Sequence, residues 1–104
     1  MKGTRPAYEL HAVVYREDGW WIARFLEHSL ATACRTLEEI PAELERFLTV
    51  QIVASLESGV EPFQDLPRAP QRFWDLYDQA DGRHEIRRFR VSGASASCDA
   101  RIAA

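Results

Sequence analysis

DGWWIARFLEH, the stretch from Asp18 to His28, decides the fold of this chain, because it joins a hairpin turn to the most aromatic strand candidate in the sequence. Asp18-Gly19 tolerates the positive φ angles that a tight hairpin requires. Before the turn, apolar and polar side chains alternate over residues 8–15, which predicts a strand with one face toward a core. The stretch therefore predicts two antiparallel strands joined by a tight turn.

The same alternation predicts which side chains point inward. In the aromatic strand both faces are largely apolar, and we choose the face that does not bury Arg24 without a partner. Trp20 is then left on the opposite face, where its cover is either a later segment or a second subunit. The side chains expected to face the core are Leu10, Ala12 and Val14 of the first strand and Trp21, Ala23 and Phe25 of the second.

A short third strand and a long helix are predicted next. Residues 30–34 are a β-like run, and Thr36-Leu37-Glu38-Glu39 has the form of a capping box. Pro41 lacks the N–H of a helix interior, so the main helix is expected to begin at Pro41 or to kink there, and to end near Ser58. Its apolar stripe, which we interpret as a core face over the sheet, comprises Leu37, Ile40, Leu44, Phe47, Leu48, Ile52 or Val53, and Leu56.

Three later segments complete the chain. Residues 70–80 predict a short helix with an aromatic side, which forms either a lid over the open sheet face or the helix flank, or a dimer contact. Residues 83–91 fit either a charged edge strand or a solvated basic tail. Residues 92–104, rich in Ser, Ala and Gly, are expected to be a flexible tail.

The predicted fold class is therefore α+β. It consists of a three-stranded antiparallel meander, with residues 85–91 as the candidate for a fourth strand, packed against one long helix and followed by a short C-terminal aromatic helix. Residues 1–91 are expected to form this as a single domain, since 104 residues suffice for one core without a disulfide or a structural metal.

The charge of the chain is unevenly distributed. Residues 1–80 carry eight Lys and Arg against thirteen Asp and Glu, a net charge of −5, whereas residues 81–104 carry five Arg against three acids, a net charge of +2. Phosphate binding draws its affinity from Lys and Arg, so the acidic body suits a basic protein partner better than a nucleic acid. No apolar run is long enough to cross a membrane, and the N-terminus lacks a secretory core, so the cytoplasm is the expected location.

No cofactor or metal is predicted. The spacings CxxC, HxxxH and HExxH are absent, and the five glycines are too scattered for a phosphate-binding loop. Glu27 and His28 stand near Cys34 in the sequence, with His11 as a neighbour across the sheet, and an enzyme would need them to converge. We interpret Cys34 instead as a buried strand thiol and Cys98 as a loose thiol of the tail, without a disulfide between them.

The order of the elements resembles the HicB-like antitoxin family over residues 8–56. The resemblance rests on the apolar strand, the Asp-Gly turn, an aromatic strand ending in Leu26-Glu27, a third strand containing Thr, and Thr36-Leu37-Glu38-Glu39 at the start of an amphipathic helix. It implies a half-size relative of the RNase H fold that lacks the nuclease carboxylates and blocks a small basic RNA-cleaving toxin. Residues 26–30 and Cys34-Arg35 depart from the family's loop pattern, and no helix-turn-helix or ribbon-helix-helix module is predicted, so operator binding is not carried over.

We therefore predict a non-catalytic protein-interaction module of HicB type, solitary or paired with a toxin, that forms a homodimer and binds a small basic toxin-like protein. The alternative is a small nucleic-acid-binding regulator that uses the basic segment from Arg83 to Arg90, because arginine suits phosphate. That segment also fits a solvated tail or a contact with the acidic body of another protomer. The partner-binding candidates are Trp20, Phe73, Trp74 and Tyr77, and the nucleic-acid-binding candidates are Arg83, Arg87, Arg88 and Arg90.

Overall fold

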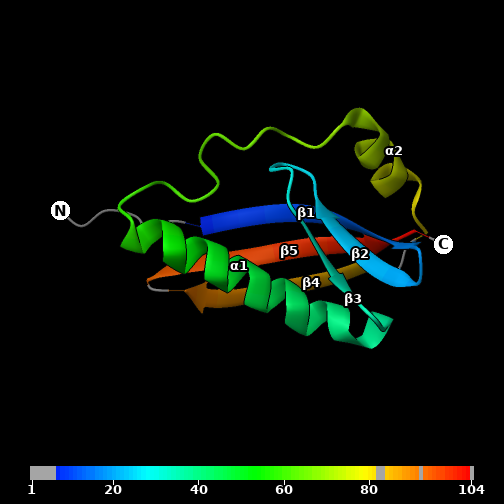
Figure 1. The fold of residues 1–104 in the computed structure, drawn as a ribbon, viewed down its shortest axis with the longest axis horizontal. Coiled ribbons are helices and arrows are strands. Elements are labelled where there is room, and N and C mark those ends of the chain that lie inside the picture. The colour runs from blue at the N-terminus through cyan, green and yellow to red at the C-terminus, as the bar shows by residue number, and fades with distance from the viewer. Residues whose placement is uncertain (1–6, 82–83, 92, 104) are drawn as a thin grey trace.

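The fold combines one curled sheet with two helices, as the α+β prediction requires (Figure 1). The computed structural model describes residues 7–81, 84–91 and 93–103, and it describes side chains over 7–81, 89–91 and 93–103. In chain order the elements are β1 (Ala7–Glu17), β2 (Trp20–Phe25), β3 (Ala31–Cys34), the 3₁₀ turn η1 (Leu37–Glu39), α1 (Ile40–Glu57), α2 (Gln71–Gln79), β4 (His84–Val91) and β5 (Ala94–Ile102).

The sheet has five strands in the order β3-β2-β1-β5-β4. β1, β2 and β3 pair antiparallel in succession, so the predicted meander is confirmed. β5 runs parallel to β1 on one side and antiparallel to β4 on the other, which makes the sheet mixed. Figure 1 shows α1 lying diagonally across this sheet, while α2 sits apart from α1, beyond β1 and β2.

The predicted hairpin turn is confirmed. Glu17 pairs with Trp20 across the two-residue turn, and Asp18 and Gly19 have φ angles of 53° and 83°. Two successive positive φ angles match the right-handed twist of the strands on either side. Aspartate and glycine are among the few residues that adopt them readily, which is why this dipeptide sets the register of β1 and β2.

The main core lies between α1 and one face of the sheet. The predicted inward side chains of β1 and β2 belong to it, with Trp21 half-buried at its margin. α1 begins at Ile40 with Pro41 in its first turn, as predicted, and the Thr36 N–H donates to the Glu39 carboxylate over 3.2 Å. Leu56 is 40% exposed, so the predicted apolar stripe ends before it. The buried side chains that α1 contributes are Ile40, Leu44, Leu48 and Ile52.

The prediction of a flexible tail over residues 92–104 is wrong for Ala94–Ile102. These residues form β5, which lies between β1 and β4 in the sheet. Their side chains alternate between the core and the opposite face, and the core-facing ones are small except for Ile102 at the end of the strand. Small side chains bring little hydrophobicity to the sequence, yet here they leave the space in which α1 packs on the sheet. The buried side chains of β5 are Ala94, Ala96, Cys98 and Ala100.

The placement of Cys98 is a second correction. Its thiol is not loose, because it is 1% exposed in the core under α1, and burial raises its pKa far above the ordinary range of a thiol. Cys34 is buried as predicted, and the two cysteines are not bridged. Both results follow from the sheet, since Cys98 pairs with Leu10 in β1 whereas Cys34 pairs with Trp21 at the far edge.

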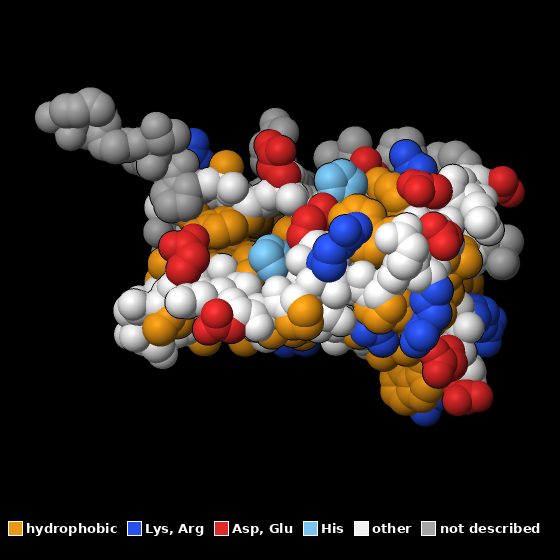
Figure 2. Space-filling view, turned by 90° about the horizontal axis from the view of Figure 1, so that it is seen from above, with side chains coloured by type: hydrophobic (Ala, Val, Ile, Leu, Met, Phe, Trp, Pro, Cys, Tyr) orange, Lys and Arg blue, Asp and Glu red, His pale blue; other side chains and the backbone are white. Residues whose placement is uncertain are grey.

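A second, smaller core lies on the opposite face of the sheet, beneath α2. Phe73 and Tyr77 are 8% and 7% exposed and pack with Val13, Leu26 and Ala103. Of the two uses predicted for the aromatic helix, the lid over the open sheet face is therefore the one observed. Figure 2 looks onto the side of the molecule that carries α2, where Lys and Arg side chains lie directly beside hydrophobic ones toward the right of the view.

Candidate functional site

Strand β3 forms one edge of the sheet, and in the described part of the chain no strand pairs with its outer side. The Phe25 N–H donates to the Leu30 carbonyl over 2.9 Å, which sets the alternation of the antiparallel β2–β3 ladder. Thr32 and Cys34 consequently turn their backbone N–H and C=O groups toward β2. Ala31 and Ala33 turn theirs away from it, and both residues are exposed.

Of the usual protections against pairing with another chain, this edge has only its shortness. Natural edge strands carry charged side chains, proline or a bulge that discourage an incoming strand. β3 reads Ala-Thr-Ala-Cys, and it pairs with β2 in unbroken register. Only its shortness, four residues, limits the pairing surface. An extended segment of another chain can therefore hydrogen-bond along Ala31 and Ala33.

A hollow borders β3 on each face, and we call the two the edge hollows. Trp20 and Ala33 line both of them, so they meet at the edge itself. Successive side chains of an added strand point to opposite faces, and each face here offers a space for them. Between β3 and α1 the hollow is also lined by Cys34, Glu39, Ala42 and Arg46, and on the opposite face by Tyr15, Ile22, Arg24 and Ala31.

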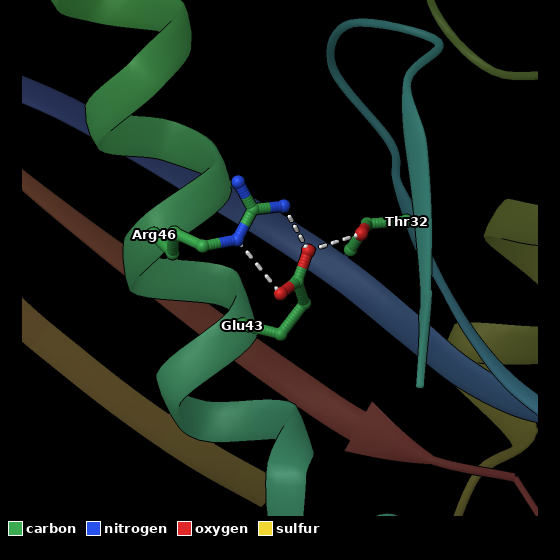
Figure 3. Close-up of polar contacts among 3 residues, drawn as sticks. All are labelled: Thr32, Glu43 and Arg46. Carbon is green, nitrogen blue, oxygen red and sulfur yellow. Dashed lines mark hydrogen bonds and ion pairs between the residues drawn. The ribbon is translucent and has the colours of Figure 1, made fainter. Parts of the chain in front are cut away.

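Three polar side chains link β3 to α1 beside the edge hollow that lies between these two elements (Figure 3). The Thr32 hydroxyl donates to Glu43 Oε2 over 2.6 Å, and Arg46 donates to both oxygens of the same carboxylate, over 2.9 and 2.5 Å. The Arg46 guanidinium, and secondarily the Thr32 hydroxyl, hold the pKa of Glu43 below its usual value although partial burial acts in the other direction. This network fixes the distance between the edge strand and the helix.

Replacing Thr32 by Val keeps the shape but removes the donor, so we expect the free energy of unfolding to fall by about 1 kcal/mol near neutral pH. The folded-state pKa of Glu43 is depressed. Its contribution to stability is therefore complete above the unfolded-state pKa of about 4.3 and is lost as the pH falls through the lower folded-state value. Urea unfolding at about pH 7 measures the loss of stability in Thr32→Val. Repeating the measurement at about pH 3 tests the pH dependence, since the free energy of unfolding of Glu43→Gln should fall less between the two pH values than that of the wild type.

Trp20 is the predicted partner-binding residue that lies at the edge. The residue is 37% exposed, and the Arg35 guanidinium carbon lies 3.8 Å from the centroid of its ring. α2 covers a different part of the sheet face to which Trp20 belongs, where Arg24 of β2 contacts Phe73 of α2. Cys34 borders the same hollow as Trp20, but burial and the carboxylates of Glu43 and Glu39 raise its pKa, so at neutral pH it is a thiol and a poor nucleophile.

The other predicted binding residues lie elsewhere. Phe73 and Tyr77 are buried on the side of α2 that faces the sheet and present almost no surface to a partner. Trp74, also of α2, is half-buried under Arg68. β4 confirms the predicted edge strand at the opposite side of the sheet. Of the four predicted nucleic-acid-binding arginines, Arg90 of β4 has an exposed side chain, and the side chains of the remaining three, Arg83, Arg87 and Arg88, lie outside the described ones.

The four residues that an enzyme would need, His11, Glu27, His28 and Cys34, do not converge at one place. Glu27 accepts from the His11 backbone N–H over 2.8 Å, and its other oxygen lies 2.5 Å from His11 Nδ1. His28 instead stacks on Phe63, and Cys34 belongs to the core under α1. The predicted proximity of His11 and Glu27 is thus confirmed, but His28 and Cys34 take separate places. Among the described residues no three His, Cys, Asp or Glu side chains gather where they could hold a metal.

Comparison of the chain with protein-family models, with curated proteins and with solved structures finds no match in any of the three. Within the described residues, none of the helices has the length and apolar content needed to cross a membrane. The edge of the sheet with its two hollows is therefore the feature on which a function can be argued.

Proposed function

We propose that this protein is a non-catalytic interaction module that binds an extended segment of a partner protein by strand addition at β3. The observation that carries the proposal is the outward-facing backbone of Ala31 and Ala33, exposed and flanked by a hollow on each face. In strand addition, main-chain hydrogen bonds supply affinity and alternating side-chain pockets supply specificity. Trp20 lies where both pockets meet and suits the role of an aromatic anchor.

A basic segment is the occupant that the surroundings of β3 favour. Residues 35–61, which follow β3 directly, contain six Glu and two Arg, a net charge of −4. Glu38, Glu39 and Glu45 are exposed, whereas Glu43 is already neutralised by Arg46. Complementary charge raises the association rate and selects among partners, so Lys and Arg are expected at the partner positions nearest α1.

The resemblance to HicB-like antitoxins supports the same class of partner. Residues 8–56, over which the resemblance holds, span β1, β2, β3 and most of α1. In the proposal the partner is a small basic toxin-like protein, and the chain acts in the cytoplasm.

The Ala33→Pro variant tests the proposal. Proline removes the N–H that faces away from β2 while leaving every N–H of the β2–β3 ladder in place, so the domain is expected to stay folded but to reject an added strand. Peptides selected on the wild-type protein from a library of short random peptides displayed on phage are expected to be basic. They should bind Ala33→Pro at least about tenfold more weakly, a loss of about 1.4 kcal/mol.

Val50→Thr is the matched control, because Val50 is 50% exposed on α1 and borders neither edge hollow, and its replacement leaves the charge around β3 unchanged. Selected peptides that bind Ala33→Pro as well as the wild type would contradict strand addition at β3. A second copy of the chain is the competing occupant of this edge. Sedimentation that gives a wild-type dimer and an Ala33→Pro monomer would assign β3 to the predicted homodimer instead of to a basic partner.

A further inference from the structure

Two arginines from distant parts of the chain meet over one aromatic ring on the α2 side of the molecule. The guanidinium carbon of Arg24, from β2, lies 4.5 Å from the centroid of Phe73, and that of Arg72, from α2, lies 4.6 Å from it. We call Arg24 and Arg72 the arginine pair. A third guanidinium, that of Arg68, lies 4.3 Å from the ring of the neighbouring Trp74. Arg68 and Arg72 are exposed, and Arg24 is half-buried.

The ring that both arginines contact limits how far apart the arginine pair can lie. Because both guanidinium carbons lie close to one ring centre, they are separated by at most the sum of the two distances, 9.1 Å. A phosphate group beside the ring that accepts charge-assisted hydrogen bonds of about 2.8 Å from both guanidinium groups lies about 4 Å from each carbon, and it can bridge carbons up to roughly 7 Å apart on the same side of the ring, a separation within the 9.1 Å limit. Stacking on Phe73 limits the freedom of both side chains and leaves their N–H edges available to a ligand.

Among the described residues, no ion pair neutralises the positive charge of these arginines. In the described part of the chain no carboxylate lies within 4.0 Å of a nitrogen of Arg24, Arg68 or Arg72. Asp75, one turn beyond Arg72 on α2, accepts instead from the Gln71 side chain over 3.0 Å. Nε of Arg24 donates to the Tyr15 hydroxyl over 3.3 Å, which positions that guanidinium without cancelling its charge.

We propose that the arginine pair binds a phosphate monoester, and that Arg68, over the ring of Trp74, adds to the positive charge of this side of the molecule. The dianion offers three oxygens to several guanidinium groups, and forked arginines bind such groups through paired hydrogen bonds. A nucleic-acid strand is a less suitable ligand, because the chain as a whole carries a net charge of −3 and repels a long polyanion. The site lies outside the edge hollows except for Arg24, and it does not depend on strand addition at β3.

The side-chain Nε–Hε signals of ¹⁵N-labelled protein test this proposal directly. Titration with a phosphoserine peptide and with adenosine monophosphate is expected to shift the signals of Arg24 and Arg72, with a dissociation constant on the order of 1 mM. Arg72→Gln, at an exposed position, is expected to weaken binding about tenfold or more, since a hydrogen bond to a charged group is lost. Arg72→Lys keeps the charge but loses the fork and should bind with intermediate affinity.

Arg16→Gln is the matched control, because Arg16 also lies over an aromatic ring, 5.3 Å from the centroid of Trp21, and no second described arginine side chain lies over that ring. It should bind as the wild type does, and so should Ala33→Pro. Binding of both probes supports a site for small phosphate esters in general, and binding of the peptide alone supports a phosphorylated protein as the source. Signals of Arg24 and Arg72 that do not move, equal binding by Arg72→Gln, or binding of single-stranded RNA alone would overturn the proposal.

Discussion

Cys98→Asn is expected to lower the free energy of unfolding by roughly 3 kcal/mol, the sum of overpacking and of burying an amide without partners. The thiol that it replaces is 1% exposed and faces the core under α1 from the strand between β1 and β4. A domain of this size loses about 4 °C or more of melting temperature per kcal/mol, so the expected fall is at least about 12 °C. Thermal unfolding followed by circular dichroism measures it.

Ser97→Asn is the control for this variant, since it introduces the same side chain one residue earlier in the same strand. Ser97 lies on the opposite face of β5 and is half-buried. Its replacement is expected to change the free energy of unfolding by only about 0.5 kcal/mol. Equal and small effects at both positions would mean that Ala94–Ile102 is a tail after all and not a strand of the sheet.

Phe73→Ala is expected to cost about 3 to 4 kcal/mol, because it removes a buried aromatic side chain and leaves a cavity that α2 cannot close. Phe73 is 8% exposed, stacks against Tyr15 with ring centroids 5.9 Å apart, and lies beneath the arginine pair. The loss therefore includes the contacts that hold α2 on the second face of the sheet. Chemical denaturation, read by tryptophan fluorescence, gives the value.

Gln79→Ala, at the exposed end of α2, provides the comparison for Phe73→Ala and should change stability by no more than about 0.5 kcal/mol. If Phe73→Ala costs as little as Gln79→Ala, then α2 is not part of the folded domain. Phe73 would then be free for the partner-binding role that the sequence suggested. The observed packing on Val13 and Leu26 leads us to expect the large effect.

The elements predicted from the sequence are those whose signals are local. The Asp18-Gly19 turn follows from dihedral preferences of two residues, and the inward faces of β1 and β2 follow from the alternation of large side chains. The start of α1 follows from Thr36 and Pro41, which act within one turn of chain. Where a few neighbouring residues determine the structure, the sequence alone was sufficient.

β5 was missed because its signal is an alternation of small residues. Ala94, Ala96, Cys98 and Ala100 alternate with polar residues at period two, but their apolar surface is too small to stand out from a Ser- and Ala-rich tail. Its place beside β1 depends on pairing across more than eighty residues of sequence, which no local pattern encodes. The strict alternation from Ala94 onward was the available clue.

The candidate site was predictable only in part. An exposed sheet edge and Trp20 were expected to bind a partner, and Trp20 does lie at the edge of β3. The link from Thr32 to Glu43 joins a strand to a helix, and the arginine pair joins β2 to α2. Contacts of this kind arise from the tertiary fold, so neither the network nor the pair has a signature in the sequence.

Amide hydrogen exchange at β3 tests strand addition most directly. With a selected basic peptide bound, the amides of Ala31 and Ala33 are expected to exchange at least about tenfold more slowly, because they gain hydrogen bonds that the free protein lacks. Thr32 and Cys34, already facing β2, should change little. Unchanged exchange at Ala31 and Ala33, with new protection on another surface of the domain, would contradict binding at this edge.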